Sequence, residues 1–194
     1  MKHRKIMGSR IKGKKERGAW AELYFMVLAM SYGLRISSPY GGFGPYDVGV
    51  ENGTGPILRV QVKCTVFRVG KGYSINCFGP KQGQKRFGYA PGTVDFFALY
   101  VVPTDDWYIM PYAAVGKHNR TLHFTPDSDD QKYGKYQEAW HLLLEAAKGR
   151  GRKGLEIRAC AGNEDAESFD LGSEVRAARS SDRVRRMFRG LFQG

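Results

Sequence analysis

Residues 94–102 constrain the fold more than any other segment, because eight of these nine residues are apolar or aromatic. A strand with apolar residues on both faces is covered on both faces, as in sheets that lie between other layers. We therefore expect an interior β-strand here. Asp95 is the exception within the run. It could join a polar site, although its place in an apolar strand favours a structural role.

A second strand is predicted in residues 57–67, where apolar and polar residues alternate. The two faces consist of Leu58, Val60, Val62 and Cys64 on one side and Arg59, Gln61, Lys63 and Thr65 on the other. Gly70-Lys71 then predicts a tight turn, after which residues 73–78 run back antiparallel. In this register Cys64 faces Cys77, which we interpret as core packing rather than a disulfide.

Two helices and two shorter strands complete the predicted elements. The first helix starts at Gly18, has apolar residues at helical spacing and ends with Gly33 as C-cap. The second helix covers residues 133–148. The strands are predicted at residues 46–50 and 107–112.

The charge of the chain indicates a class of partner. Of its 194 residues, 31 are Lys or Arg and 19 are Asp or Glu, which gives a net charge of +12 and a pI near 9.7. Such a charge favours a polyanionic partner, most often nucleic acid, although a membrane surface or ribosomal RNA would select the same charge. No apolar run approaches the roughly 20 residues of a membrane span. We expect a cytoplasmic, nucleoid-associated protein without membrane contact.

Composition divides the chain into three parts. Residues 1–17 contain eight basic residues and one acidic residue, which predicts a basic arm. Residues 18–148 hold the predicted core. Residues 149–194 form a charged, flexible tail in which Val184, Met187, Phe188 and Leu191 have helical spacing between arginines. That short amphipathic helix is either a frayed end or a segment that docks on a partner subunit or on DNA.

Four polar residues are candidates for a catalytic site. Gln61 and Lys63 project from one face of their strand, a hairpin can bring Asp47 beside them, and Glu22 on the first helix can reach the same place. Oxygen ligands of this kind hold hard divalent ions such as Mg²⁺, with Mn²⁺ as a substitute, and the main-chain carbonyl of Val62 can complete the set. Such an ion polarises a phosphate and activates water, and a nearby lysine orients that water or offsets charge. The spacing alone is a weak signal.

The order of these motifs along the chain resembles that of the PD-(D/E)XK nucleases. The resemblance covers about residues 14–148. It rests on Gly18-x-x-x-Glu22, Pro45-Tyr46-Asp47, Gln61-Val62-Lys63 and the strands at 94–100 and 107–111. It is greatest toward the branch that includes a group I intron-encoded homing endonuclease, where glutamine also stands in the (D/E) position. Archaeal Holliday-junction resolvases are similar over the first half.

This resemblance implies an α/β fold with a restriction-endonuclease-like core, in which a mixed β-sheet is flanked by helices. It implies Glu22 and Asp47 as metal ligands, Gln61 as a ligand or water-holder, and Lys63 as the catalytic lysine. The expected activity is Mg²⁺-dependent hydrolysis of double-stranded DNA by a homodimer or homotetramer. A junction resolvase or repair nuclease is the first alternative. A DNA-binding protein with a degenerate site is the second.

Two segments are candidates for DNA contact. The turn with Arg68 and Lys71 ends a β-hairpin, and a two-stranded ribbon fits the major groove. The following loop carries cations and amides without an acidic residue, and its candidate residues are Lys81, Gln82, Gln84, Lys85 and Arg86.

Overall fold

The structure is a computed structural model. It describes residues 11–42, 44–79, 81–82, 85–86, 88–115, 121–128 and 131–149. The first ten residues of the predicted basic arm, Gln84 and the tail from residue 150, with its predicted amphipathic helix, lie outside these residues. Within the described residues, no helix has both the length and the apolar character needed to cross a membrane.

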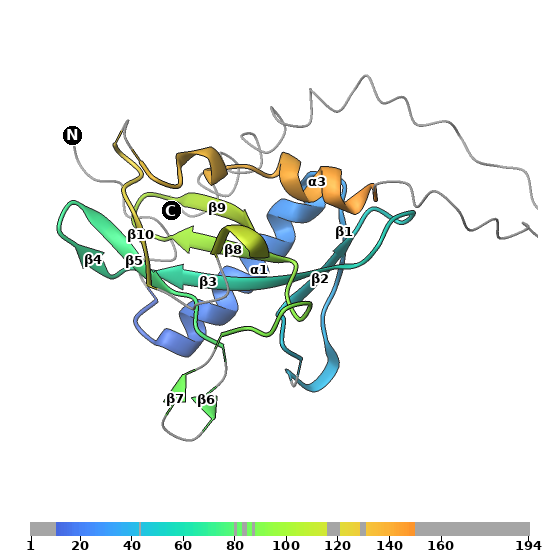
Figure 1. The fold of residues 1–194 in the computed structure, drawn as a ribbon, viewed down its shortest axis with the longest axis horizontal. Helices are drawn as coiled ribbons and strands as arrows, with labels where there is room; N and C mark the ends of the chain where they lie inside the picture. Colours follow the sequence, from blue (N-terminus) through green and yellow to red (C-terminus); the bar gives the residue numbers. More distant parts are fainter. Residues whose placement is uncertain are drawn as a thin grey trace, which may run out of the picture.

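Five strands form the main sheet in the spatial order β1-β2-β3-β8-β9 (Figure 1). Their bounds are Arg35–Ser37, Val48–Glu51, Leu58–Thr65, Phe96–Val101 and Asp106–Pro111. β3 and β8 run parallel, whereas the other neighbouring pairs are antiparallel. The sheet is therefore mixed, as expected, and β8 is an interior strand that is buried along its whole length. β1 was not predicted, because three residues are too few to show alternation.

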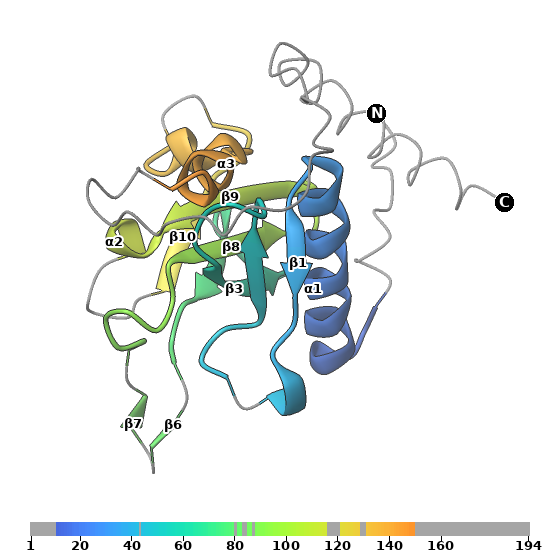
Figure 2. The same cartoon turned by 90° about the vertical axis from the view of Figure 1, so that its right-hand side faces the viewer.

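Helix α1, Lys14–Ser31, packs along one side of this sheet (Figure 2). It begins one turn before the predicted Gly18, because residues 14–17 are Lys-Lys-Glu-Arg, which favour helix without adding to an apolar pattern. The helix ends at Ser31, just before Gly33, which was predicted to stop it and has a φ of +82°. The N–H groups of Gly33 and Leu34 bond back to helix carbonyls, so the chain turns sharply into β1.

Residues 133–148 do not form the single helix that was predicted. A short 3-10 turn, η3, and a short helix, α3, take its place and span Gly134–Tyr136 and His141–Ala147. Between them Gln137 forms an isolated bridge with Tyr108. Glu138 has a φ of +52°. Its main-chain N–H donates to the Trp107 carbonyl at 2.7 Å, and its Oε1 accepts a hydrogen bond from the main-chain N–H of Trp107 at 2.8 Å. The helix is interrupted because these residues bond to β9 instead.

A second, three-stranded sheet has the order β10-β5-β4, with bounds Thr121–Phe124, Gly72–Asn76 and Arg68–Val69. The predicted turn is confirmed, since Arg68 pairs with Tyr73 and Gly70 has a φ of +56°. However, β3 pairs with β8 while β5 pairs with β10. Cys64 and Cys77 therefore pack against different core clusters, and the prediction that they face each other is wrong.

Two small elements complete the fold. α2, Tyr112–Val115, follows β9 directly. β6 and β7, Lys81–Gln82 and Lys85–Arg86, pair as a hairpin that projects from the body of the molecule (Figures 1 and 2).

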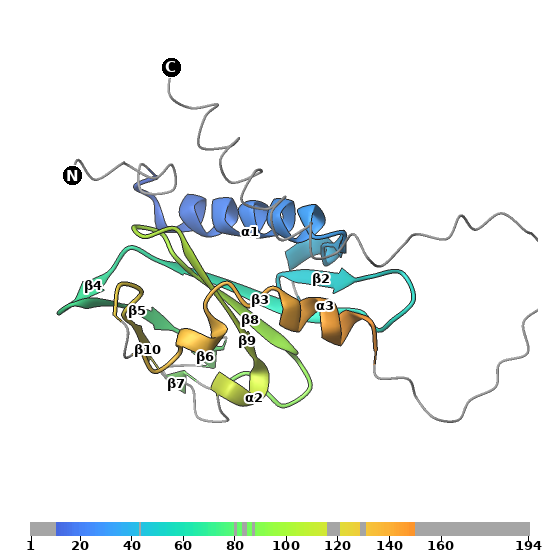
Figure 3. The same ribbon diagram turned by 90° about the horizontal axis from the view of Figure 1, so that it is seen from above.

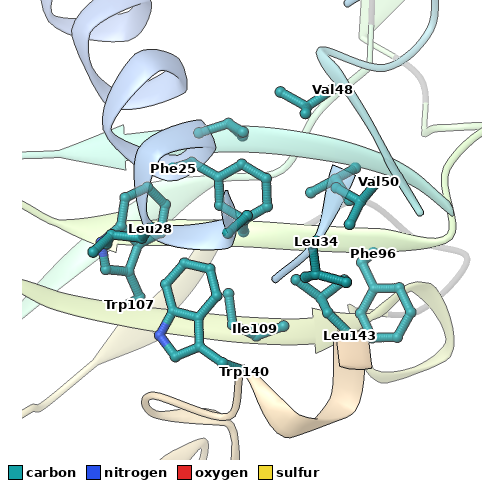
Figure 4. Packing of buried hydrophobic residues seen from close by; sticks show 14 of the residues in the cluster. Phe25, Leu28, Leu34, Val48, Val50, Phe96, Trp107, Ile109, Trp140 and Leu143 are labelled. Atoms are coloured by element: carbon teal, nitrogen blue, oxygen red, sulfur yellow. The ribbon is translucent and has the colours of Figure 1, made fainter. Parts of the chain in front are cut away.

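The main sheet separates two hydrophobic clusters. The first lies under α1 and α3 and includes Phe25, Leu28, Trp107, Trp140 and Leu143 (Figure 4). The second contains side chains from α2, β5, β8, β9 and β10. Figure 3 shows α2, β5 and β10 on the side of the main sheet that lies away from α1. Both faces of β3 and β8 are therefore covered, and a polar side chain on either face lies inside the protein or at its edge.

Candidate active site

The ladder between β2 and β3 stops at Asp47. The last paired residues are Val48 and Val60, and the Asp47 N–H donates to the Val60 carbonyl at 3.0 Å. β3 continues to Thr65 with β8 beside it, but among the described strands none pairs with its other side there. Because β2 extends no further along β3, one edge of β3 is open at this place, although β3 is the middle strand of the sheet.

The side chain of Asp47 occupies part of that open edge. Its Oδ2 accepts the N–H of Val62 at 2.8 Å and a hydrogen bond from Nε2 of Gln61. Among the described residues, Oδ1 has no hydrogen-bond donor. One carboxylate oxygen is thus anchored to β3, and the other remains available to a ligand.

The carbonyl of Val62 shares this edge. The N–H and C=O of one residue in a strand point to the same side, so the Val62 carbonyl points to the side where its N–H meets Asp47. A main-chain oxygen and a carboxylate therefore lie at one place.

Gln61 and Lys63 project from the face of β3 that lies away from α1. Their partners in register on β8 are Phe97 and Leu99, which belong to the second core cluster. Gln61 is only 5% exposed and Lys63 is half-buried. The alternation in the sequence shows that Gln61 and Lys63 share a face, but it does not show that the layer with α2, β5 and β10 covers this face.

Glu22 reaches the site from α1. It follows the fully buried Ala21 and is itself half-buried. Burial and the nearby charge of Asp47 raise the pKa of Glu22, and Lys63 partly opposes this shift. Glu22, Asp47 and Lys63 are therefore within electrostatic range of one another.

The ionised form of Asp47 is disfavoured in a similar way. Burial raises the pKa of its carboxyl above the ordinary value, although the Lys63 charge and the Val62 N–H act against the shift. The fold thus holds two carboxylates in a partly dehydrated place, where burial disfavours both charges and the charge of Asp47 adds to the cost at Glu22. A bound cation would relieve that cost.

Comparison with known proteins decides the family. A family model described as PD-(D/E)XK endonuclease matches residues 12–143. The chain belongs to the PD-(D/E)XK endonuclease family. Among solved structures, it is similar to the bacterial homing endonuclease I-Ssp6803I, with a TM-score of 0.61 and 22% identity, over 71% of this chain and 97% of that chain. No curated protein matches the chain.

These findings confirm the predicted family and the restriction-endonuclease-like core. The similarity to the homing endonuclease is a similarity of fold, in which nearly the whole of that protein matches. Family membership supports a nuclease function for this PD-(D/E)XK endonuclease.

The oxygen donors of the PD-(D/E)XK site fit a hard divalent cation. Glu22 and Asp47 supply carboxylates, and Val62 supplies a main-chain carbonyl. Within the described residues, no group of three or more His, Cys, Asp and Glu side chains could hold a metal. An ion at this place would therefore depend on two carboxylates together with neutral oxygens, which suits Mg²⁺ better than a softer metal.

The ammonium of Lys63 in this endonuclease forms no close ion pair among the described residues. It has no salt bridge within 4.0 Å to any of them, unlike Arg59, whose Nε lies 2.9 Å from Asp95 Oδ2. Its ammonium is instead near the ring of Tyr89, at 6.0 Å from the centroid. Sequence reasoning missed Tyr89, because a single tyrosine in a loop belongs to no periodic pattern.

Asp95 has the structural role that the sequence favoured. Its carboxylate accepts a hydrogen bond from Nε of Arg59 at 2.9 Å and another from the main-chain N–H of Arg59 at 2.8 Å. Burial alone would raise the pKa of Asp95, but these bonds and the guanidinium charge lower it below its ordinary value. Asp95 therefore ties the start of β8 to β3 and lies outside the candidate site.

The residues expected to contact DNA lie on the two hairpins. Arg68 and Lys71 are exposed at the tip of the β4–β5 hairpin. The backbones of Lys81, Gln82, Lys85 and Arg86 form the β6–β7 hairpin, and Gln84 lies outside the described residues. The β4–β5 hairpin follows closely in sequence after the strand that carries Lys63.

Proposed function

We propose that this protein is a Mg²⁺-dependent endonuclease that hydrolyses phosphodiester bonds of double-stranded DNA, in the manner of a homing endonuclease. The observation that carries the proposal is the anchored carboxylate of Asp47, bonded through Oδ2 to Gln61 and Val62 and close to the charges of Glu22 and Lys63. Membership of an endonuclease family supports the same chemistry.

Glu22, Asp47 and the Val62 carbonyl are the residues we assign to the metal, with Gln61 as a further ligand or as a holder of water. A bound Mg²⁺ would supply polarisation of the scissile phosphate and a more acidic water. Mn²⁺ has the same preference for oxygen ligands and is expected to substitute.

The protein's own side chains would do the remaining work. Asp47 is held by β3, so its free oxygen needs little reorganisation to bind a ligand. Lys63, which forms no ion pair within 4.0 Å among the described residues, can orient or deprotonate a water and offset negative charge on the phosphate as it is attacked. Gln61 keeps Asp47 in place through its amide N–H.

The positive charge of the chain and the exposed cations of the β4–β5 hairpin support DNA as the substrate. Cleavage of both strands requires two such sites, so we propose a homodimer or homotetramer that acts on nucleoid DNA in the cytoplasm.

One assay tests this function against its alternatives. Supercoiled plasmid, linear duplex and four-way junctions are incubated with the protein, with Mg²⁺, Mn²⁺ or EDTA, and separated on a gel. Metal-dependent cutting of the duplexes supports the proposal. Cutting confined to junctions would favour a resolvase. DNA binding without cutting in any metal would favour a DNA-binding protein with a degenerate site and would contradict the proposed activity.

A further inference from the structure

Tyr89 occupies a fixed place beside the candidate active site. It lies shortly after β7 and is 8% exposed. Its ring meets that of Phe97 edge-on, with centroids 5.3 Å apart, and its carbonyl accepts the hydroxyl of Tyr112 at 2.8 Å. Both the ring and the backbone of Tyr89 are therefore held by the second core cluster.

The fixed ring faces the free charge of the site. Lys63 Nζ lies 6.0 Å from the Tyr89 ring centroid, at the outer range for attraction between a cation and an aromatic ring. Burial raises the pKa of the Tyr89 phenol, while the Lys63 charge and a side-chain hydrogen bond with Lys63 oppose the shift. The phenol is thus neutral near neutral pH, and its oxygen can accept a hydrogen bond from the ammonium.

We propose that Tyr89 is a positioning residue that holds the Lys63 ammonium at the open edge of β3. A lysine has a long flexible chain, and its amine contributes to a reaction only while it stays within reach of the reacting water. The described residues give Lys63 no carboxylate partner in a close ion pair, so an aromatic ring and a phenol oxygen supply the restraint without neutralising the charge. This inference rests on the proposed nuclease function.

The first test separates chemistry from binding. Cleavage is measured in single-turnover conditions with enzyme in excess, and DNA affinity is measured separately in Ca²⁺, for the native protein, Tyr89→Phe and Tyr108→Phe. Tyr108 is the matched control, because it is a buried tyrosine of the same cluster whose hydroxyl bonds to Gln131 at 2.8 Å. We expect Tyr89→Phe to slow cleavage about tenfold or more, as loss of supporting partners around an active site does, with DNA affinity unchanged. The control should cut at the native rate.

A second test needs no cleavage. The side-chain ¹³Cε resonance of Lys63 in ¹³C-lysine-labelled protein is identified by its loss in Lys63→Arg. It should move in Tyr89→Phe, where the hydroxyl is removed, and in Tyr89→Leu, where the ring current is removed as well. It should stay in place in Tyr108→Phe.

The outcomes separate the two proposals. A native protein that cuts, together with a Tyr89→Phe variant that cuts equally fast, overturns the positioning role and leaves the nuclease proposal intact. A native protein that never cuts overturns the nuclease function. The resonance then judges the contact alone: a shift supports the contact between Tyr89 and Lys63, and no shift in either Tyr89 variant overturns it.

Discussion

Nε2 of Gln61 donates a hydrogen bond to Oδ2 of Asp47, the same oxygen that accepts the Val62 N–H. Gln61 therefore does more than fill the position where an acid is common in this type of site. An amide can donate to a carboxylate, whereas a carboxylate at the same place would repel it. The neutral residue keeps Asp47 anchored before any metal binds.

Substitution of Gln61 tests both sides of this arrangement. Gln61→Glu should tighten Mg²⁺ binding because it adds a charge, yet it should destabilise the metal-free protein, where two carboxylates would then meet. It need not speed cleavage, since extra charge also repels phosphate. Gln61→Ala should slow cleavage because Asp47 loses a partner. Calorimetry, denaturation in EDTA and plasmid nicking measure the three effects, and an Ala variant that is as active as the native protein would show that Gln61 has no role.

Lys63→Ala should slow plasmid cleavage by about 10²–10⁴-fold, the usual contribution of a group that transfers or orients a proton. DNA affinity should change by no more than a few-fold, because the substitution removes at most one cation that could bind a phosphate. Lys132→Ala is the control, since Lys132 is also close to an aromatic ring, at 5.3 Å from that of Tyr133. Native cleavage by the Lys63 variant would refute the assigned site.

Asp47→Asn and Glu22→Gln should each weaken Mg²⁺ or Mn²⁺ binding, because each removes one of two carboxylates from a site whose other donors are neutral. Isothermal calorimetry on the metal-free protein measures this directly. Asp106→Asn, a change of one carboxylate on β9, serves as the control. Unchanged affinity in both site variants would remove the metal site from the proposal.

The raised pKa of Glu22 and of Asp47 makes the stability of the metal-free protein depend on pH. A folded acid with a raised pKa binds protons more readily than the unfolded chain does. The contribution of these groups to the free energy of unfolding therefore falls as pH rises from their ordinary values through their raised folded values.

Glu22→Gln should remove part of this dependence and stabilise the metal-free protein near neutral pH, by less than about 1 kcal/mol, because Glu22 is half-exposed and solvent screens its charge. Urea denaturation in EDTA from about pH 4 to about pH 8 follows the effect. Glu145→Gln, at an exposed position on α3, should leave the profile unchanged. A parallel profile for native and Glu22→Gln protein would contradict the prediction.

Replacement of Arg68 and Lys71 by alanine should weaken binding to all duplexes and reduce the salt dependence of affinity, by about 0.9 in slope for each phosphate that the protein no longer neutralises. The double variant Lys132→Ala/Lys135→Ala removes the same charge from two other exposed positions. Fluorescence anisotropy over a range of salt concentrations compares them. Equal slopes in the two double variants would place the DNA elsewhere.

Much of the sheet and the site could be predicted from local patterns. The apolar run at 94–102 and the alternation around Val62 specify strands by themselves, and the polar residues at 61 and 63 share a face in any strand. The helix end at Gly33 was also predictable, since the turn needs a positive φ that glycine adopts at little cost.

The remaining features depend on contacts between distant residues. The apolar spacing of residues 133–148 cannot reveal that Glu138 bonds to Trp107 and interrupts the helix. Alternation in β3 cannot reveal that a second sheet covers Gln61. Likewise, the meeting of Cys64 with Cys77 depended on β5 pairing with β3, and β8 takes that place.

The separation of the core into two clusters has a consequence for spectroscopy. All three tryptophans, Trp20, Trp107 and Trp140, belong to or pack against the cluster under α1 and α3. Lys63 and Tyr89 face the other side of the sheet, where tyrosine and phenylalanine supply the aromatic rings of the described residues. Tryptophan emission therefore reports on one half of this protein. Events around the candidate lysine have to be followed through tyrosine signals or through isotopes.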